Sequence, residues 1–230
     1  MCIRDRVMKL ATPDGTPVAA LFDYATHATS LGPRNLQISG DVLGLAAQFV
    51  EKILGPDVTA PVFAGASGDI DPWYRVLPSF ETENGWIPEP ELLGTLLGVE
   101  VVHVFRKIET TSSTGEIRTE LVTLELPARK NERDEDAAPT KPLNVTVATI
   151  GDVAFVGLGC ELLTEVGMAI KAESPYKHTF VITHCNGRAG YLPPKHLYDD
   201  GGYEIDRTGF ADQAADILVE ETLRILSELK

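Results

Sequence analysis

The sequence predicts an α/β protein with a layered mixed sheet and flanking helices, and two observations support this fold class. Short runs rich in Val, Ile, Leu and Thr alternate with longer stretches whose apolar residues recur at helical spacing. The 230 residues are 43% hydrophobic, which is enough to bury one large core, or at most two small ones. We expect one globular unit.

The first elements are two strands of a β-hairpin that is already in progress near the start of the chain. In VMKLATPDGTPVAALFDYA, the pair Asp14-Gly15 is a turn signal between two apolar runs. Residues 1–6, MCIRDR, resemble a translated sequencing adapter, and we expect them to be foreign to the protein. Because the fold begins within a sheet, we expect its N-terminal part to be missing and residues 7–230 to form the C-terminal part of one domain.

The remaining elements follow from periodicity and from breaker residues. The clearest helix begins at Asp41 and stops before Gly55-Pro56. The segment ARKNERDEDAAPTKP is charged, contains proline and lacks periodicity, which predicts a disordered loop. The patterns predict further helices over 88–108, 161–172 and 208–229, and strands over 60–63, 117–126, 178–183 and within 144–158.

Charge and cysteine content exclude several classes of protein. A net charge of −14 disfavours nucleic acid and anionic membrane surfaces as partners. No apolar stretch reaches the roughly 20 residues of a membrane helix, and no signal peptide is visible. Cys2, Cys160 and Cys185 are too few for a disulfide framework. We favour buried thiols at Cys160 and Cys185, with a single disulfide between them as the alternative.

Reactive side chains follow four apolar runs at the point where each run ends. These places are His27, the loop GASGDIDP, the segment GCELL and the segment CNGRAGYLPP. If the strands lie side by side, their ends converge on one crevice that holds a histidine, carboxylates and a tyrosine. Such a set could coordinate zinc, although neither HExxH nor CxxC is present. Taken alone, His27 is more readily interpreted as a hydrogen-bonded histidine at a strand end than as a metal ligand.

Four longer motifs resemble one enzyme family. FDYATHATSLGPRNLQISGDVLGLAAQFVE, FAGASGDIDP, GLGCELLTEVGMAI and CNGRAGYLPPKHLYDDGGYE occur in the order and approximate spacing of the neutral/alkaline non-lysosomal ceramidases. The resemblance extends from about residue 17 to the C-terminus. Its specificity comes from four motifs that recur in order.

The resemblance implies a catalytic zinc that is held in an α/β domain and activates water to cleave the amide of ceramide. By their motifs, His27, Glu161 and Tyr191 match family zinc ligands, and Tyr203 matches a tyrosine that stabilises the developing negative charge. Another zinc histidine of the family lies upstream, and no histidine precedes His27 here. We therefore expect the chain to be an inactive fragment with three of the four ligands.

The local sequence is compatible with these roles. We expect Glu161 in the first turn of its helix, where the dipole favours a carboxylate. Tyr191 lies before Pro193-Pro194, which stiffen the turn, and Tyr203 follows two glycines that allow close approach of a ligand. Without the family, either tyrosine is better interpreted as an ordinary half-buried aromatic residue with its hydroxyl satisfied.

One departure concerns Asp71, which replaces a serine of the family in GDIDP. An aspartate could act as a general base, but in its ionised form it cannot donate a hydrogen bond as a hydroxyl does. For Asp69 we favour a turn or supporting role over calcium binding. His184 and Asn186 are expected to be no more than wall residues, and His103, His178 and His196 to be surface or core histidines.

Two functions follow. The first is a zinc-dependent hydrolase of an N-acyl sphingoid base or another small-molecule or lipid amide or ester, with Asp71 and Tyr203 as catalytic residues. The second is a catalytically silent relative that acts as an extracytoplasmic binding domain. The resemblance implies a secreted or periplasmic protein.

Overall fold

The computed structural model describes residues 6–32, 35–72, 81–82, 85–86, 89–130 and 138–230. The chain divides into two compact units, and each has its own hydrophobic core. Unit 1 contains residues 65–70 and 114–230, and unit 2 contains residues 5–64 and 71–113. Most of the adapter-like segment, residues 1–5, lies outside the described residues.

Unit 2 contains a three-stranded mixed sheet. Strands β1 (Arg6–Ala11) and β2 (Pro17–Tyr24) pair antiparallel as the predicted hairpin, and β3 (Val62–Ala64) pairs parallel to β2. Gly15 adopts φ 91° in the turn, which is the left-handed region that favours glycine. The hairpin prediction is therefore confirmed, including its turn residue.

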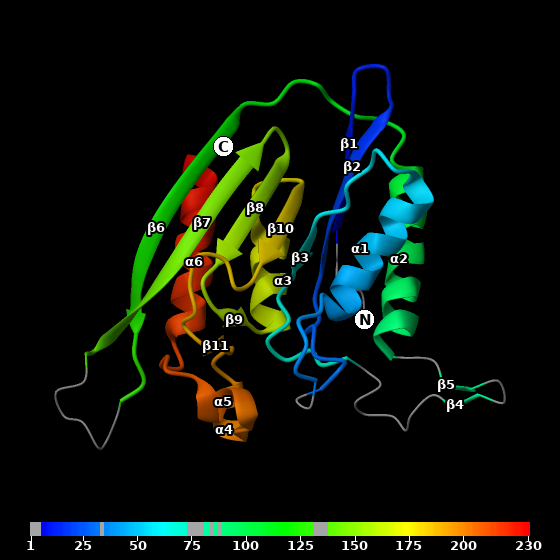
Figure 1. Cartoon of the computed structure of the whole chain (residues 1–230). Helices are drawn as coiled ribbons and strands as arrows, with labels where there is room; N and C mark the ends of the chain where they lie inside the picture. The colour runs from blue at the N-terminus through cyan, green and yellow to red at the C-terminus, as the bar shows by residue number, and fades with distance from the viewer. Residues whose placement is uncertain (1–5, 33–34, 73–80, 83–84, 87–88, 131–137) are drawn as a thin grey trace. The chain divides into compact units, whose positions relative to one another are not determined.

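Two helices pack side by side against this sheet (Figure 1). They are α1 (Asp41–Leu54) and α2 (Glu89–Lys107), as periodicity predicts, and Gly55 ends α1 at φ 122°. A further two-stranded pair, β4 (Glu81–Thr82) and β5 (Gly85–Trp86), precedes α2. The core of the sheet and helices comprises Ala20, Phe22, Ala46, Val50, Ala60, Val101, Val102 and Phe105.

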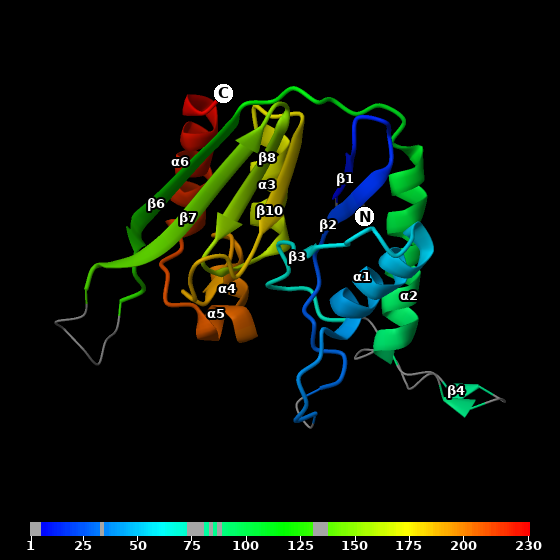
Figure 2. The same ribbon diagram turned by 45° about the horizontal axis from the view of Figure 1, so that its top comes forward.

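Unit 1 is built on a four-stranded mixed sheet in the order β10-β8-β7-β6. The strands are β6 (Ile117–Pro127), β7 (Thr140–Ile150), β8 (Val153–Leu158) and β10 (His178–Ile182), and only the β10–β8 pair is parallel. Alternate residues of β7 are buried, so this strand presents one face to the core. Helices α3 (Thr164–Glu173) and α6 (Ala214–Glu228) cover that face (Figure 2). The predicted α/β class is confirmed.

Short elements lie beyond the ends of β8 and β10. Strands β9 (Glu161–Leu162) and β11 (Tyr191–Leu192) pair in parallel, and the short helices α4 (Leu197–Asp200) and α5 (Tyr203–Arg207) follow. The sequence did not predict β9 or β11. Two residues offer too little periodicity to be recognised as a strand.

Two helix starts were predicted too early. Residues 161–163 are extended because the Glu161 N–H donates to the Gly190 carbonyl (2.9 Å), so α3 begins at Thr164. Residues 208–211 pair with the end of β6, where the Ala211 N–H donates to the Pro127 carbonyl (2.9 Å). Helix α6 therefore begins at Ala214, and the prediction of a helix from residue 208 is wrong.

The charged loop predicted between residues 128 and 142 is shorter than expected. Residues 131–137 lie outside the described residues, and β7 already begins at Thr140. Ala128 and Arg129 are held by backbone hydrogen bonds to Pro139 and Gly209 (each 2.9 Å). Among the described residues, no helix combines the length and the apolar character needed to cross a bilayer.

Candidate metal and active site

In unit 2, His27 lies just beyond the C-terminal end of β2. The strand ends at Tyr24, which pairs with Ala64 of the parallel strand β3, and His27 follows after two further residues. Its side chain is half-buried. This position matches the sequence prediction, since the carboxyl ends of parallel strands are where α/β folds place reactive groups.

The loop after His27 is fixed to α1 by a buried carboxylate. Asp41 is 3% exposed, and its carboxylate accepts hydrogen bonds from the Ser30 hydroxyl and from the N–H groups of Leu31 (3.0 Å) and Val42 (2.8 Å). Asp41 has φ 49°, an uncommon conformation for a residue other than glycine. Ser30 and Asp41 therefore explain the motifs HATS and SGD structurally, because together they set the path of the chain after His27.

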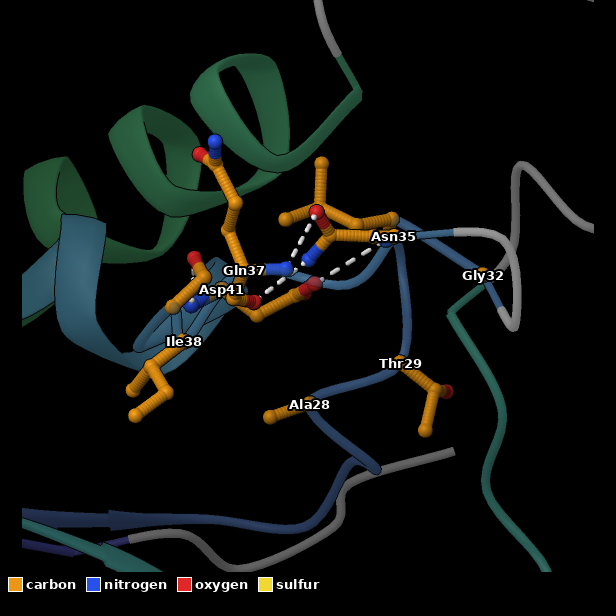
Figure 3. A pocket seen from close by; sticks show the side chains of 9 residues that line it. Ala28, Thr29, Gly32, Asn35, Gln37, Ile38 and Asp41 are labelled. Carbon is orange, nitrogen blue, oxygen red and sulfur yellow. Dashed lines mark hydrogen bonds between the residues drawn. The ribbon is translucent and has the colours of Figure 1, made fainter.

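The same loop borders an open hollow of about 480 Å³ (Figure 3). The side-chain amide of Asn35 donates to the Gln37 carbonyl (2.8 Å), which holds one wall. Apolar Leu31 and Ile38 and polar Thr29 also line the hollow. Its lining is thus partly apolar and partly rich in hydrogen-bonding groups.

Asp71 also belongs to unit 2. The Thr29 hydroxyl donates to its carboxylate (3.3 Å), and Asp71 is exposed. The structure therefore places the predicted general base against the loop that begins at His27.

In unit 1, Glu161 and Tyr191 are direct neighbours in the β9–β11 ladder. The Tyr191 phenol also lies close enough to the Glu161 carboxylate for the two groups to interact electrostatically. Desolvation raises the pKa of the Tyr191 phenol, and the nearby Glu161 carboxylate raises it further. The structure brings these two predicted ligands together, although Glu161 lies in a strand and not, as predicted, in the first turn of a helix.

Tyr203 lies beside Tyr191 in unit 1. Their ring centroids are 5.9 Å apart at an interplanar angle of 74°, an edge-to-face arrangement. The guanidinium of Arg207 lies over the Tyr203 ring, 5.4 Å from its centroid. Tyr203 is 60% exposed, so its hydroxyl is accessible from solvent.

The segment 65–70 connects this group of residues to α3. The Asp69 carboxylate accepts hydrogen bonds from the N–H (2.8 Å) and hydroxyl (2.9 Å) of Thr164, the first residue of α3. Gly68 donates its N–H to the Leu162 carbonyl (2.8 Å), and a Cβ atom at Gly68 would lie 2.9 Å from the Glu161 carbonyl. Asp69 thus has the supporting role predicted for it, and Gly68 allows the segment to lie against β9.

His184, predicted from the sequence to be no more than a wall residue, lies beside Glu161. A ring nitrogen of His184 and a carboxylate oxygen of Glu161 lie within 4.8 Å of each other. Both residues are in unit 1, so this unit places an imidazole beside a carboxylate that could hold a metal ion. The signal was present in HCNG after β10, since Asn-Gly marks a turn at a strand end.

The cysteines of unit 1 are free thiols. Cys160 is buried and Cys185 is half-buried, so the favoured prediction of thiols is confirmed for this pair, although burial is complete only for Cys160. Cys2 lies outside the described residues.

We expect iodoacetamide to alkylate Cys185 in the folded chain and to leave Cys160 unmodified. Burial, and secondarily the charge of Glu161, raises the pKa of the Cys160 thiol. The reactive thiolate therefore stays scarce even as the solution is taken from about pH 7 to about pH 9. Peptide mass spectrometry of native and urea-unfolded samples measures both sites. Equal labelling of the two cysteines in the native sample would contradict this expectation.

Fold and side chains together define an α/β protein with histidine, carboxylate and tyrosine side chains of the kind that bind metals. No protein-family model and no curated protein matches the sequence. Its structure is similar to the crystal structure of neutral ceramidase from Pseudomonas aeruginosa, with a TM-score of 0.75 and 15% identity over 97% of this chain and 46% of that chain. It is also similar to a ceramidase complexed with C2, with a TM-score of 0.74 and 14% identity over 98% of this chain and 47% of that chain.

These comparisons establish the fold of the chain. The chain shares the α/β fold of the ceramidase structures and spans less than half the length of each. The resemblance predicted from four sequence motifs is thereby confirmed at the level of the fold.

Proposed function

We propose that the chain is part of a zinc-dependent hydrolase resembling neutral ceramidase, which cleaves an N-acyl sphingoid base or another amide or ester. The observation that carries this proposal is the pairing of Glu161 with Tyr191. The family resemblance implies both as ligands, and they are adjacent in space although distant in sequence. A metal site whose ligands come from different segments requires such an approach.

The proposed zinc ligands are His27, Glu161 and Tyr191. They offer an imidazole nitrogen, a carboxylate oxygen and a phenol oxygen, and the first two are donors that zinc commonly takes in proteins. When bound, zinc lowers the pKa of water and supplies a nucleophile near neutral pH.

The other residues act on the substrate and on protons. The Tyr203 hydroxyl donates a hydrogen bond to the substrate oxygen on which negative charge develops, and Arg207 over its ring adds positive charge nearby. Asp71 accepts a proton from the attacking water, and its hydrogen bond from Thr29 holds the carboxylate in place.

The proposed substrate is amphiphilic. Leu31 beside the open hollow after His27 suits an apolar chain, whereas Thr29 and Asn35 suit hydroxyl or amide groups. This combination favours a lipid amide. The family resemblance further suggests action outside the cytoplasm, in a secreted or periplasmic protein.

The test is zinc content and hydrolysis of a short-chain N-acylsphingosine, measured on this chain and on any longer product of the same gene. We expect one zinc per chain in the active protein. Glu161→Gln should weaken zinc binding more than about 100-fold and abolish hydrolysis. The reason is that mutation of a residue that only hydrogen-bonds to a metal ligand already lowers metal affinity or activity roughly 10–100-fold, and loss of a ligand should cost more.

Glu165→Gln is the matched control. Glu165 lies in α3, is exposed, and forms an ion pair with His196 (3.4 Å), so zinc content and turnover should stay at the unmodified level. Equal behaviour of the two variants would overturn the proposal. Zinc binding without turnover on any amide or ester would favour the alternative of a silent binding domain, for which the replacement of the family serine by Asp71 is the motivation.

A further inference from the structure

His184 occupies a left-handed turn that follows β10. It has φ 57° and is followed closely by Asn186 with φ 55°, and neither residue is a glycine. Positive φ is uncommon outside glycine, and histidine and asparagine are among the residues that adopt it most readily, so the two positions mark a defined turn.

The surroundings of this turn enforce it through the backbone. The His184 N–H donates to the Cys160 carbonyl (3.1 Å), and the Cys185 N–H donates to the Leu158 carbonyl (2.9 Å). The Asn186 side chain donates to the Thr146 hydroxyl of β7 (2.9 Å). These bonds hold the turn against the residues that immediately precede Glu161. They therefore fix the backbone of His184, from which the imidazole extends, relative to the backbone of Glu161.

The separation of the two side chains suits a shared metal ion. Ligand atoms about 2.0–2.1 Å from a tetrahedral zinc lie roughly 3.4 Å apart. The ring nitrogen of His184 and the carboxylate oxygen of Glu161 are within 4.8 Å of each other, so both lie near enough to approach one ion. The His184 side chain is exposed, and an ion can therefore reach it from solvent.

We propose that His184 is a metal ligand that acts with Glu161, so that unit 1 by itself provides a histidine–carboxylate pair for zinc. This inference rests on the proposed function for the identity of the metal. It adds a nitrogen donor that the family resemblance does not assign, in a chain in which no histidine precedes His27. The competing interpretation is a plain ion pair between an imidazole and a carboxylate.

The test is protection of histidines from diethyl pyrocarbonate by zinc, read for each residue by peptide mass spectrometry on the unmodified chain. The reagent acylates accessible unprotonated imidazoles, and coordination blocks this reaction. We expect stoichiometric zinc to reduce the labelling of His184 at least tenfold. His196, which pairs with Glu165 at 3.4 Å, is the matched control, and its labelling should change less than twofold.

Variants provide the second measurement. His184→Asn keeps a residue that tolerates the left-handed conformation but lacks the imidazole, and it should weaken zinc binding at least tenfold. His196→Asn should stay within twofold of the unmodified chain, and the unfolding temperatures of both metal-free variants should agree.

The outcomes separate this inference from the proposed function. If zinc binds in a Glu161-dependent manner while His184 is labelled as fast as without zinc, the inference is wrong and the zinc hydrolase proposal stands. If the chain and every longer product of its gene bind no zinc, both fail. Protection of His184 together with the loss in His184→Asn establishes the ligand.

Discussion

Gly94→Ala is expected to lower the free energy of unfolding of unit 2 by about 1–2 kcal/mol, because overpacking costs roughly 1–3 kcal/mol and the better helix propensity of alanine offsets part of it. Gly94 lies in α2 where that helix meets α1. A Cβ atom there would lie 2.6 Å from the Leu45 Cβ and 3.0 Å from the Val42 carbonyl oxygen. The first contact is shorter than real Cβ atoms show and the second is tighter than most, so the helices would have to shift apart.

Gly44→Ala is the matched control for Gly94→Ala. Gly44 lies in α1, and a Cβ atom there meets nothing within 4 Å. The variant should therefore gain about 0.5–1 kcal/mol from reduced backbone entropy in the unfolded chain. Urea denaturation, with hydrogen exchange of the α1 and α2 amides, measures both variants. If Gly94→Ala proved as stable as Gly44→Ala, the close approach of the two helices would be refuted.

Gly167→Ala is expected to destabilise unit 1 by about 1–3 kcal/mol through the same kind of overpacking. Gly167 lies in α3, and a Cβ atom added there would overlap the methyl group of Ala66 in the segment 65–70. Its other neighbours, side-chain atoms of Leu162 and Val181, would be at an ordinary 3.7 Å. The clash is thus with a single methyl group.

The double variant Ala66→Gly/Gly167→Ala moves the methyl group from position 66 to position 167 and tests this clash directly. Ala66→Gly alone should cost about 1 kcal/mol, but in the double variant it removes the clash, so we expect a favourable coupling of about 1–2 kcal/mol. Chemical denaturation of the four proteins of this cycle measures the coupling. Simple additivity of the two single changes would show that Gly167 and Ala66 are not in contact.

The sequence predicts the elements whose determinants are local. The hairpin is encoded by Asp14-Gly15 between alternating runs, and α1 is encoded by its apolar stripe with a stop at Gly55. Each signal lies within the element, so a pattern in one segment is sufficient.

The errors concern residues whose conformation is decided by a distant partner. Glu161 looks like the start of a helix in sequence but is drawn into β9 by Gly190 and Tyr191. Thr208 looks helical but is held extended, with its hydroxyl donating to the Tyr191 carbonyl (2.8 Å). No window around either residue contains that information.

The candidate site shows the same division. Family motifs identify Glu161, Tyr191 and Tyr203, and the structure brings all three together in unit 1. His184 is predicted from the sequence to be only a wall residue, because its place beside Glu161 depends on a left-handed turn and on a carboxylate from another strand. Its residue type alone could not distinguish it from His196.

The segment 65–70 has a consequence for the inheritance and exchange of gene segments. It supplies Ala66 and Asp69 to unit 1, although the chain on both sides of it belongs to unit 2. A recombination event that replaces residues 114–230 with those of a relative would therefore leave behind part of the packing partner of α3. The sequence of one unit therefore cannot be exchanged between relatives without regard to the other. Substitution of Gly167 by a larger residue should be accepted in evolution together with a smaller residue at position 66.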